Sequence, residues 1–189
     1  MPDSVEVSVV LPAYDEEATI ESAVGVTVDA LEAFLPPGSF EVVVAEDGCT
    51  DRTPEIAARL AAEDDRIRHV HSDRRLGRGR ALVAAFRAAD GDVLAYLDTD
   101  LATDMDYLEP LIESVRSGEY DVATGSRWIR GREADRPAKR GVPSRVYNGF
   151  ARVVLGSSLR DHQCGFKAFD REALFDLLPD VEDQHWFWD

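Results

Sequence analysis

The sequence predicts an α/β fold in which helices pack against a mostly parallel sheet. Short apolar runs alternate with longer stretches of helical periodicity, the pattern of repeated strand–helix units. Hydrophobic residues make up 44% of the 189 residues, which is enough for one substantial core. We therefore expect a single domain over residues 1–189. We also expect this domain to be truncated at its C-terminal end, because the aromatic cluster at 185–189 carries no helix stop signal.

Three strand–helix pairs are predicted in the first half of the chain. Each strand is a short apolar run, and each helix follows it with a longer periodic stretch. The second helix has the clearest start, with Thr53 predicted as its N-cap and Pro54 as its first residue. The pairs are strand 5–11 with helix 16–34, strand 40–45 with helix 53–63, and strand 67–71 with helix 79–89.

The alternation continues with a strand at 93–97, a helix at 107–115 and a strand at 120–124. Residues 130–143 are rich in Arg and Gly, and we expect a loop there. Residues 144–155 predict an amphipathic helix. Its apolar stripe either packs on the core or lies along a lipid.

The balance of charge is strongly acidic. Asp and Glu number 37 against 21 Lys and Arg, for a formal net charge of −16. This excess disfavours nucleic acid as a partner, since neutralising phosphates requires clustered Lys and Arg. An acidic surface suits a high-salt cytoplasm, where salt screens the self-repulsion, and an ordinary acidic protein is the alternative.

Two cysteines, Cys49 and Cys164, have no CxxC partner, so they indicate neither a zinc site nor a disulfide scaffold and fit a reducing cytoplasm. We expect Cys164 to be a small buried residue rather than a nucleophile. The sequence contains no apolar run near the roughly 20 residues of a membrane helix, and its start lacks a signal-peptide pattern. A soluble, unexported chain is therefore expected.

Polar residues follow three of the predicted strands, at the sheet edge where α/β proteins bind ligands. Asp98 and Asp100 come directly after strand 93–97 and can share one hard divalent cation, although many such pairs are merely solvated. Residues 46–51 can accept hydrogen bonds from a nucleobase and a ribose, and Asp51 or Thr53 can instead cap the next helix.

A basic, glycine-containing turn at 74–80 opens the third predicted helix. It can bind a diphosphate, and an exposed Arg-rich turn without a ligand is the alternative. The turn lacks the GKS or GKT of a Walker P-loop. The chain also lacks a GxGxxG after its first strand, which disfavours a dinucleotide oxidoreductase.

Six motifs follow one another along the chain, at residues 8–17, 46–51, 76–79, 98–100, 125–127 and 163–167. Their order resembles that of the family 2 inverting glycosyltransferases, and among these the dolichyl-phosphate (polyprenyl-phosphate) glucose and mannose synthases. Each motif is loose by itself, whereas six in one order are specific. The resemblance implies the GT-A fold, a Rossmann-like three-layer α/β/α sandwich with a mostly parallel central sheet.

The resemblance also implies an activity, a cofactor and partners. It implies transfer of a hexose from a UDP-sugar or GDP-sugar to a polyprenyl phosphate, with Mg²⁺ or Mn²⁺. The enzyme would work at the cytoplasmic face of the cell membrane, with peripheral or tethered membrane contact.

Site residues are implied by their positions in the motifs. The nucleotide would be bound by Pro12, Ala13, Tyr14, Glu16, Glu46, Asp47, Gly77, Arg78 and Asp98. Asp98 and Asp100 would hold the metal and act in catalysis, and Arg127 would meet the diphosphate or the acceptor phosphate. Gln163 and Lys167 would lie beside the sugar and the acceptor. Asp189 looks like a further catalytic residue of the glucosyl-type members, with Asp183 as the second candidate.

Two departures from the family pattern bear on specificity. Glu46 stands where members usually have Asp, which can change the reach of contacts to base or donor. Ala102 stands where mannosyl-type synthases commonly carry a metal-binding Gln. Glucose is therefore favoured over mannose.

Three alternatives stay open. A family 2 transferase that extends a glycan or modifies a protein hydroxyl would share every nucleotide motif. A sugar-1-phosphate nucleotidyltransferase is disfavoured, because the segment Pro12 to Glu17 is acidic rather than basic and glycine-rich. A non-catalytic sugar-nucleotide-binding module is disfavoured by the intact pair Asp98 and Asp100.

Overall fold

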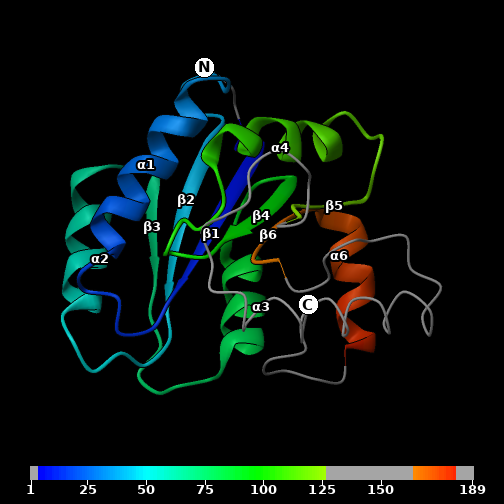
Figure 1. Ribbon diagram of the computed structural model, residues 1–189. Coiled ribbons are helices and arrows are strands. Elements are labelled where there is room, and N and C mark those ends of the chain that lie inside the picture. The colour runs from blue at the N-terminus through cyan, green and yellow to red at the C-terminus, as the bar shows by residue number, and fades with distance from the viewer. Residues whose placement is uncertain (1–3, 127–163, 182–189) are drawn as a thin grey trace, which may run out of the picture.

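The structure is a computed structural model that describes residues 4–126 and 164–181. Its centre is a six-stranded sheet with the order β3-β2-β1-β4-β6-β5 (Figure 1). The strands are β1 Val7–Ala13, β2 Phe40–Glu46, β3 Ile67–Val70, β4 Val93–Leu97, β5 Val122–Thr124 and β6 Phe166–Asp170. β6 runs antiparallel to β4 and β5, and the other paired strands are parallel. The predicted mostly parallel sheet is confirmed.

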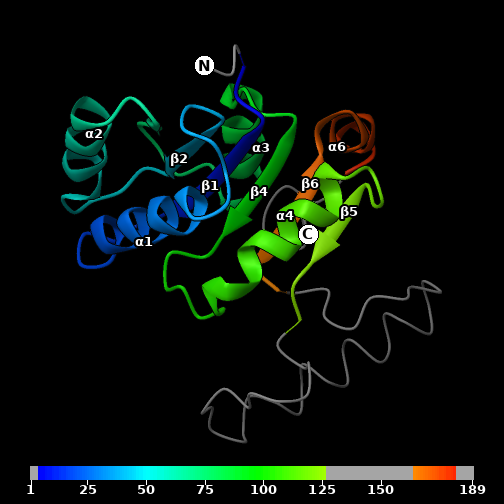
Figure 2. The same cartoon turned by 90° about the horizontal axis from the view of Figure 1, so that it is seen from above.

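Helices cover both faces of this sheet. The helices are α1 Ile20–Glu32, α2 Thr53–Glu63, α3 Arg78–Ala88, α4 Leu108–Arg116 and α6 Arg171–Leu177, with short 3-10 turns at Met105–Tyr107 and Leu178–Asp180. α1, α2 and α4 pack on one face, and α3 and α6 pack on the other, each over its own hydrophobic cluster (Figure 2). The three-layer α/β/α sandwich is therefore confirmed. No helix in the described ranges is long and apolar enough to cross a membrane.

The central strands are apolar on both sides because helices cover both faces. In β1, Val9 and Leu11 face the cluster of α1, α2 and α4, whereas Val10 faces the cluster of α3 and α6. Val42 and Val43 of β2 divide between the two clusters in the same way. The continuous valine runs of the sequence are explained by this double burial.

Two predicted helix starts need correction. The first helix begins at Ile20 rather than at residue 16, because Glu16 and Glu17 are held in a turn by bonds from their N–H groups to Thr53 and Asp51. The prediction of Thr53 as N-cap is also wrong. Thr53 is the first residue of α2, and the Asp51 carboxylate accepts hydrogen bonds from its N–H and its hydroxyl, at 2.9 and 2.6 Å. Arg52 is the N-cap residue, and its side chain makes no capping bond; the bond from the first helical N–H goes to Asp51, in line with the alternative that Asp51 caps this helix.

Cys164 is 1% exposed, so the prediction of a small buried residue is confirmed. The predicted loop at 130–143 and the predicted helix at 144–155 lie outside the described residues, as do the predicted site residues Arg127, Gln163, Asp183 and Asp189.

Candidate active site

Three parallel strands deliver polar residues to the same edge of the sheet, as predicted from the sequence. β1, β2 and β4 end side by side, and the residues that follow each strand lie at this carboxyl edge (Figure 1). The last residues of β1 and β2 are paired, Ala13 with Glu46, and the Asp47 N–H continues the ladder with a 3.0 Å bond to the Ala13 carbonyl. The sheet thus brings segments from three parts of the chain into one site.

Asp98 and Asp100 lie on a tight turn immediately after β4. The Asp98 carbonyl accepts a bond from the Leu101 N–H at 3.1 Å, and an Asp100 oxygen accepts from the Ala102 N–H at 3.0 Å. Leu101 has a φ of 45°, in the left-handed region, so the chain reverses direction here. A small cavity of about 60 Å³ borders both carboxylates and the residues just before β6.

Gly165 fixes the position of Asp98 from the neighbouring strand. The Asp98 N–H donates to the Gly165 carbonyl at 3.1 Å. A Cβ at position 165 would lie 2.6 Å from Asp98 Oδ1 and closer still to Oδ2, so any larger residue here would displace this carboxylate. The sequence places Gly165 in a motif but gives it no role, because the contact joins the residue before β6 to the residue after β4.

The donor set of this turn fits a hard divalent cation. The Asp98 side chain is 42% exposed and Asp100 is exposed, so both carboxylates are open to solvent. Both supply only oxygen, the ligand that Mg²⁺ and Mn²⁺ prefer. The two residues predicted as metal ligands are thus placed on one turn where such an ion can be bound.

Arg78, the first residue of α3, reaches across to this pair. Its Nη2 lies 2.6 Å from Asp98 Oδ1, and its guanidinium lies 5.6 Å from the centre of the Tyr96 ring. The contact brings together two residues that the sequence predicted for one site. α3 carries no acidic residue in its first turn, so its N-terminal end is electropositive. This end and Arg78 favour an anion next to the carboxylate pair.

The basic turn before α3 is anchored by Asp47. Its two carboxylate oxygens accept bonds from the N–H groups of Leu76 and Gly77, at 2.5 and 3.0 Å. Gly48, with a φ of 63°, brings its Cα against the backbone of Arg74, and a Cβ there would lie 2.5 Å from the Arg74 carbonyl carbon. The acidic turn after β2 therefore holds the basic turn in place, a role that sequence reasoning did not find.

Glu46 is occupied by groups of its own chain. Its side chain is 0% exposed, it pairs with His71, and it accepts from the N–H groups of Ser72 and Cys49 at 3.3 and 3.4 Å. Burial opposes ionisation of this carboxyl, but the hydrogen bonds from His71 and the Cys49 N–H outweigh burial and lower the pKa of Glu46. Its predicted contact with a base or ribose stays a prediction.

Three further predicted residues, Tyr14, Glu16 and Lys167, differ in their exposure to solvent. Tyr14 is 37% exposed, and the Arg75 guanidinium lies 3.7 Å from the centre of its ring. Glu16 is partly buried and accepts a bond from the Thr19 hydroxyl at 2.5 Å. Lys167, on β6, is 4% exposed, and its ammonium group donates to the Tyr96 hydroxyl at 3.3 Å, so its side chain is buried against β4.

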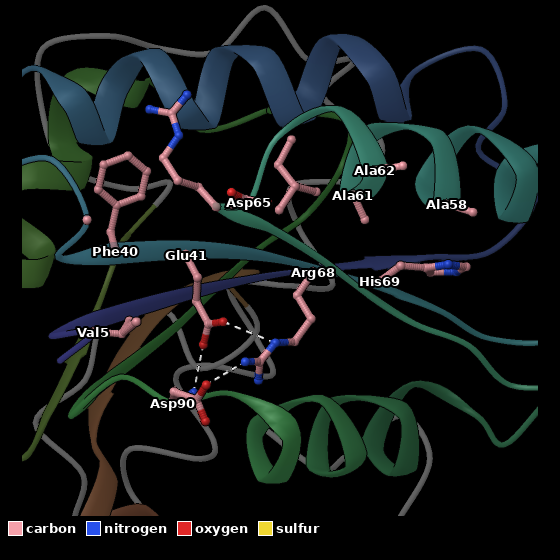
Figure 3. A pocket seen from close by; sticks show the side chains of 13 residues that line it. Val5, Phe40, Glu41, Ala58, Ala61, Ala62, Asp65, Arg68, His69 and Asp90 are labelled. Carbon is pink, nitrogen blue, oxygen red and sulfur yellow. Dashed lines mark hydrogen bonds and ion pairs between the residues drawn. The ribbon is translucent and has the colours of Figure 1, made fainter. Parts of the chain in front are cut away.

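A larger hollow of about 700 Å³ lies elsewhere, along edge strand β3 and towards the amino ends of the strands (Figure 3). Alanines of α2 line one side of it. Its other side carries a network in which Arg68 pairs with Glu41, at 3.3 Å, and with Asp90. Because Arg68 is already paired with both carboxylates and the hollow is away from the carboxyl edge, we do not assign the candidate site to it.

Comparison with known proteins identifies a family. Residues 8–178 match the family described as Glycosyl transferase family 2. The chain is 72% identical over 185 residues to Glycosyltransferase AglD of Haloferax volcanii, covering 98% of this chain and 30% of that protein. It is 30% identical over 197 residues to Dolichyl-phosphate beta-glucosyltransferase ALG5C of Trichomonas vaginalis, covering 100% of this chain and 58% of the relative. The chain thus spans well under two thirds of the length of both relatives.

A solved structure resembles the fold as well. Glucosyl-3-phosphoglycerate synthase from Mycobacterium tuberculosis, in complex with Mn²⁺, UDP-glucose and phosphoglyceric acid, superposes with a TM-score of 0.64 at 28% identity. The match covers 90% of this chain and 58% of that one. Sequence match, fold and the arrangement of the carboxyl edge agree, and the chain belongs to glycosyl transferase family 2.

Proposed function

We propose that residues 1–189 form the catalytic domain of a metal-dependent inverting hexosyltransferase. It moves glucose, or as the next choice mannose, from a UDP-sugar or GDP-sugar to a polyprenyl phosphate at the cytoplasmic face of the membrane. The observation that carries this proposal is the exposed Asp98 and Asp100 turn with Arg78 beside it. This turn offers a cation site and a diphosphate site in direct contact.

The names of the relatives support a lipid phosphate acceptor. Besides the Trichomonas enzyme, they include the Dolichol-phosphate mannosyltransferase of Pyrococcus furiosus, 28% identical over 173 residues. A second group acts on undecaprenyl phosphate, as in the 4-deoxy-4-formamido-L-arabinose transferase of Pectobacterium carotovorum, 30% identical over 177 residues. The shared acceptor class among these names is a polyprenyl phosphate.

The roles of the residues follow from their placement. Asp98 and Asp100 would hold Mg²⁺ or Mn²⁺, which supplies positive charge to the diphosphate of the donor. Arg78 and the N-terminal end of α3 orient that diphosphate. Asp47 holds the turn before α3 in place through its hydrogen bonds to the backbone of that turn. Tyr14 and Arg75 present a stacked surface beside the nucleotide.

Inversion requires in-line attack. An oxygen of the acceptor phosphate forms the new bond to the anomeric carbon, while the bond from that carbon to the diphosphate breaks and the nucleoside diphosphate leaves with the electron pair. A phosphate with a second pKa of about 6 is already largely anionic at neutral pH, so the attack needs positioning more than a general base. Arg127, Gln163 and Lys167 are proposed to position the acceptor, and Asp189, or else Asp183, would serve as a base for a hydroxyl acceptor.

A transfer assay tests the proposal. The chain is incubated with radiolabelled UDP-glucose or GDP-mannose, Mg²⁺ or Mn²⁺, and a polyprenyl phosphate, and the label is then extracted into organic solvent. We expect label in the organic phase with one donor, and a decrease of about 100-fold or more in Asp100→Asn. The matched control Asp29→Asn removes the same charge from an exposed position on α1 and should keep full activity.

Two results would contradict parts of the proposal. Full transfer by Asp100→Asn would remove the metal assignment. Label found only on an added soluble oligosaccharide, with none in the organic phase, would replace the lipid acceptor with a glycan. That second outcome has some support, since Low-salt glycan biosynthesis hexosyltransferase Agl6 of Haloferax volcanii is 36% identical over 169 residues.

A further inference from the structure

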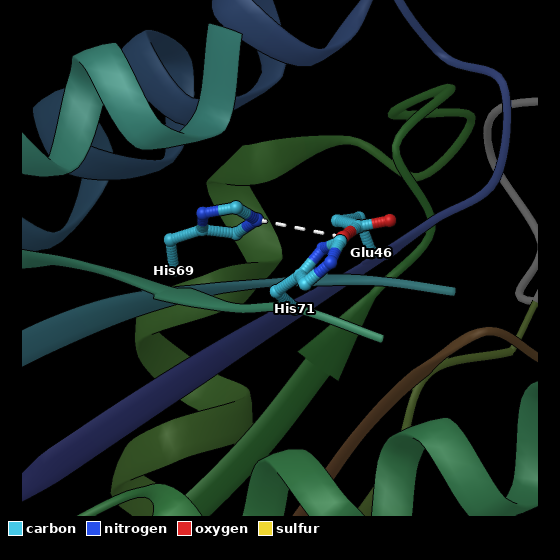
Figure 4. A group of neighbouring side chains, drawn as sticks. All are labelled: Glu46, His69 and His71. Carbon is cyan, nitrogen blue, oxygen red and sulfur yellow. Dashed lines mark hydrogen bonds and ion pairs between the residues drawn. The ribbon is translucent and has the colours of Figure 1, made fainter. Parts of the chain in front are cut away.

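Two histidines and a glutamate converge beside the carboxyl edge, apart from the Asp98 and Asp100 turn. Glu46 is the last residue of β2, His69 lies on β3, and His71 follows just after it (Figure 4). β2 and β3 are paired in parallel with Val44 opposite His69, so the register brings His71 level with Glu46. Because side chains alternate along a strand, His69 and His71 point to the same side.

The three side chains present their ligand atoms to a common point. One ring nitrogen from each histidine and a Glu46 oxygen all lie within 4.8 Å of one another. His69 Nε2 is 3.7 Å from Glu46 Oε1, and within the part of the chain that the structure describes it has no hydrogen-bond partner. A buried polar nitrogen without a partner is costly, so a ligand bound at this nitrogen would remove that cost.

A further contact resembles the surroundings of a metal-binding histidine. His71 directs Nδ1 towards Glu46, while its Nε2 lies 3.0 Å from Asp73 Oδ1. In metal sites the far nitrogen of a ligating imidazole is usually held by a carboxylate or a carbonyl, which fixes the ring orientation and the tautomer. Asp73 occupies that position.

We propose that Glu46, His69 and His71 form a second cation site, selective for a borderline divalent ion such as Zn²⁺ and completed by a solvent ligand. Two imidazole nitrogens and one carboxylate oxygen suit Zn²⁺, whereas the oxygen pair Asp98 and Asp100 suits Mg²⁺ or Mn²⁺. Tetrahedral zinc with bonds of about 2.0–2.1 Å places its ligand atoms roughly 3.3 Å apart. The separation of 3.7 Å between His69 and Glu46 is close to this value.

Little rearrangement is needed to admit the ion. The His71 side chain is 51% exposed, so its ring can swing away from Glu46 and exchange their direct contact for two bonds to the metal. The Glu46 side chain is 0% exposed and the His69 side chain 15%, so those two ligands are already held in place. The ion would fasten the end of β3 to β2, directly before the turn that leads to Arg78.

A zinc-binding measurement tests this proposal without any need for transfer activity. The 189-residue chain is treated with a chelator and titrated with Zn²⁺ against a chromophoric competitor, at high salt. We expect one tightly held Zn²⁺ per chain, and a visible absorption band when Co²⁺ replaces it. His71→Asn should lose the tight site and the band, and Asp73→Asn should weaken binding by about tenfold to 100-fold.

Two control variants test whether other possible ligands hold the Zn²⁺. Asp100→Ala should bind Zn²⁺ as the unmodified chain does, since it alters only the other turn. Cys49→Ser should also bind normally. Cys49, Asp15 and Asp51 form a second group of possible ligands, but burial raises the pKa of the Cys49 thiol and keeps it from being a good one. Circular dichroism and the denaturation midpoint in chelator establish that each variant is folded.

The outcomes are decisive because His71 is half exposed and its replacement spares the core. Failure of the unmodified chain to bind Zn²⁺ would overturn the proposal and leave His71 and Glu46 as an ordinary ion pair. Tight binding that survives His71→Asn, or that is lost in Cys49→Ser or Asp100→Ala, would overturn it too. The zinc titration is read without transfer activity, so its failure is distinguishable from a failure in the organic-phase assay.

Discussion

Gly165→Ala should impair catalysis by displacing Asp98 rather than by unfolding the protein. The new Cβ would lie 2.6 Å from Asp98 Oδ1 and closer still to Oδ2, whereas ordinary contact begins near 3.4 Å. Oδ1 alone must therefore withdraw by about 0.8 Å, and the carboxylate as a whole by about 1 Å. That movement alters the 2.6 Å contact with Arg78 and shifts a proposed metal ligand.

The size of the effect follows from this displacement. Misplacing a reacting or binding group by about 1 Å costs about 100-fold in rate, which is about 2.7 kcal/mol of transition-state stabilisation. We therefore expect kcat/KM for transfer from the preferred donor to fall by about 100-fold, with a small change in the urea midpoint. The organic-phase assay measures the first quantity, and circular dichroism during urea denaturation measures the second.

Gly25→Ala provides the matched control. Gly25 lies within α1, and a Cβ there would meet nothing within 4 Å. Alanine at this position should raise the free energy of unfolding by about 0.5–1 kcal/mol and leave transfer unchanged. Gly165→Ala activity within a factor of about three of the unmodified chain would show that Asp98 has room to adjust, and would refute the reasoning.

Three other predictions concern the acidic turn and the surface. Asp47→Asn leaves one oxygen to serve two N–H groups, so the donor KM should rise and the free energy of unfolding should fall by about 1 kcal/mol, as kinetics and urea denaturation would measure. The hydrogen bond to Glu46 raises the pKa of His71 in the folded chain. In chelator, the stability that this pair contributes should therefore be complete below the ordinary histidine pKa of 6.5 and be lost as pH rises through the raised pKa. Urea midpoints measured against pH should show this loss in the unmodified chain and not in His71→Asn. With a net charge of −16, the melting temperature should drop between about 1 M and about 0.1 M salt, as the screening length grows from about 3 to 10 Å; a melting temperature independent of salt would contradict the high-salt interpretation.

The sequence predicts the sheet well because its signals are local. Each parallel strand is a short apolar run, so β1, β2 and β4 and the turns after them are found within a few residues of their true positions. The place of β6 is different. Nothing in the pattern of residues 166–170 says that this strand inserts antiparallel between β4 and β5, because that choice is made by long-range pairing.

The contacts inside the site were harder to predict for the same reason. Asp47 is 29 residues from Leu76, to which it is bonded, and Gly165 reaches Asp98 from another strand. Sequence rules place the cap of α2 next to Pro54, at Thr53, whereas in the structure Arg52 is the N-cap residue and Asp51 bonds the Thr53 N–H from two residues away. His69 and His71 are two residues apart, the spacing that places two side chains on one face of a strand, but only the pairing of β2 with β3 brings them to Glu46.

The carboxylates at the carboxyl edge of the sheet fall into two groups, according to whether they hold neighbouring turns in place or are accessible to solvent. Glu46, Asp47 and Asp51 are each bonded to N–H groups of their own chain, so they maintain the frame of the site. Asp98 and Asp100 also have partners in the chain, Arg78 and the Ala102 N–H, but both side chains are accessible to solvent, where a cation can reach them. Removing a framing carboxylate should therefore lower stability and substrate binding together, whereas removing Asp100 should lower kcat at nearly constant stability. If Asp47→Asn instead lowered kcat at unchanged stability, Asp47 would act on the substrate directly rather than by holding the turn before α3.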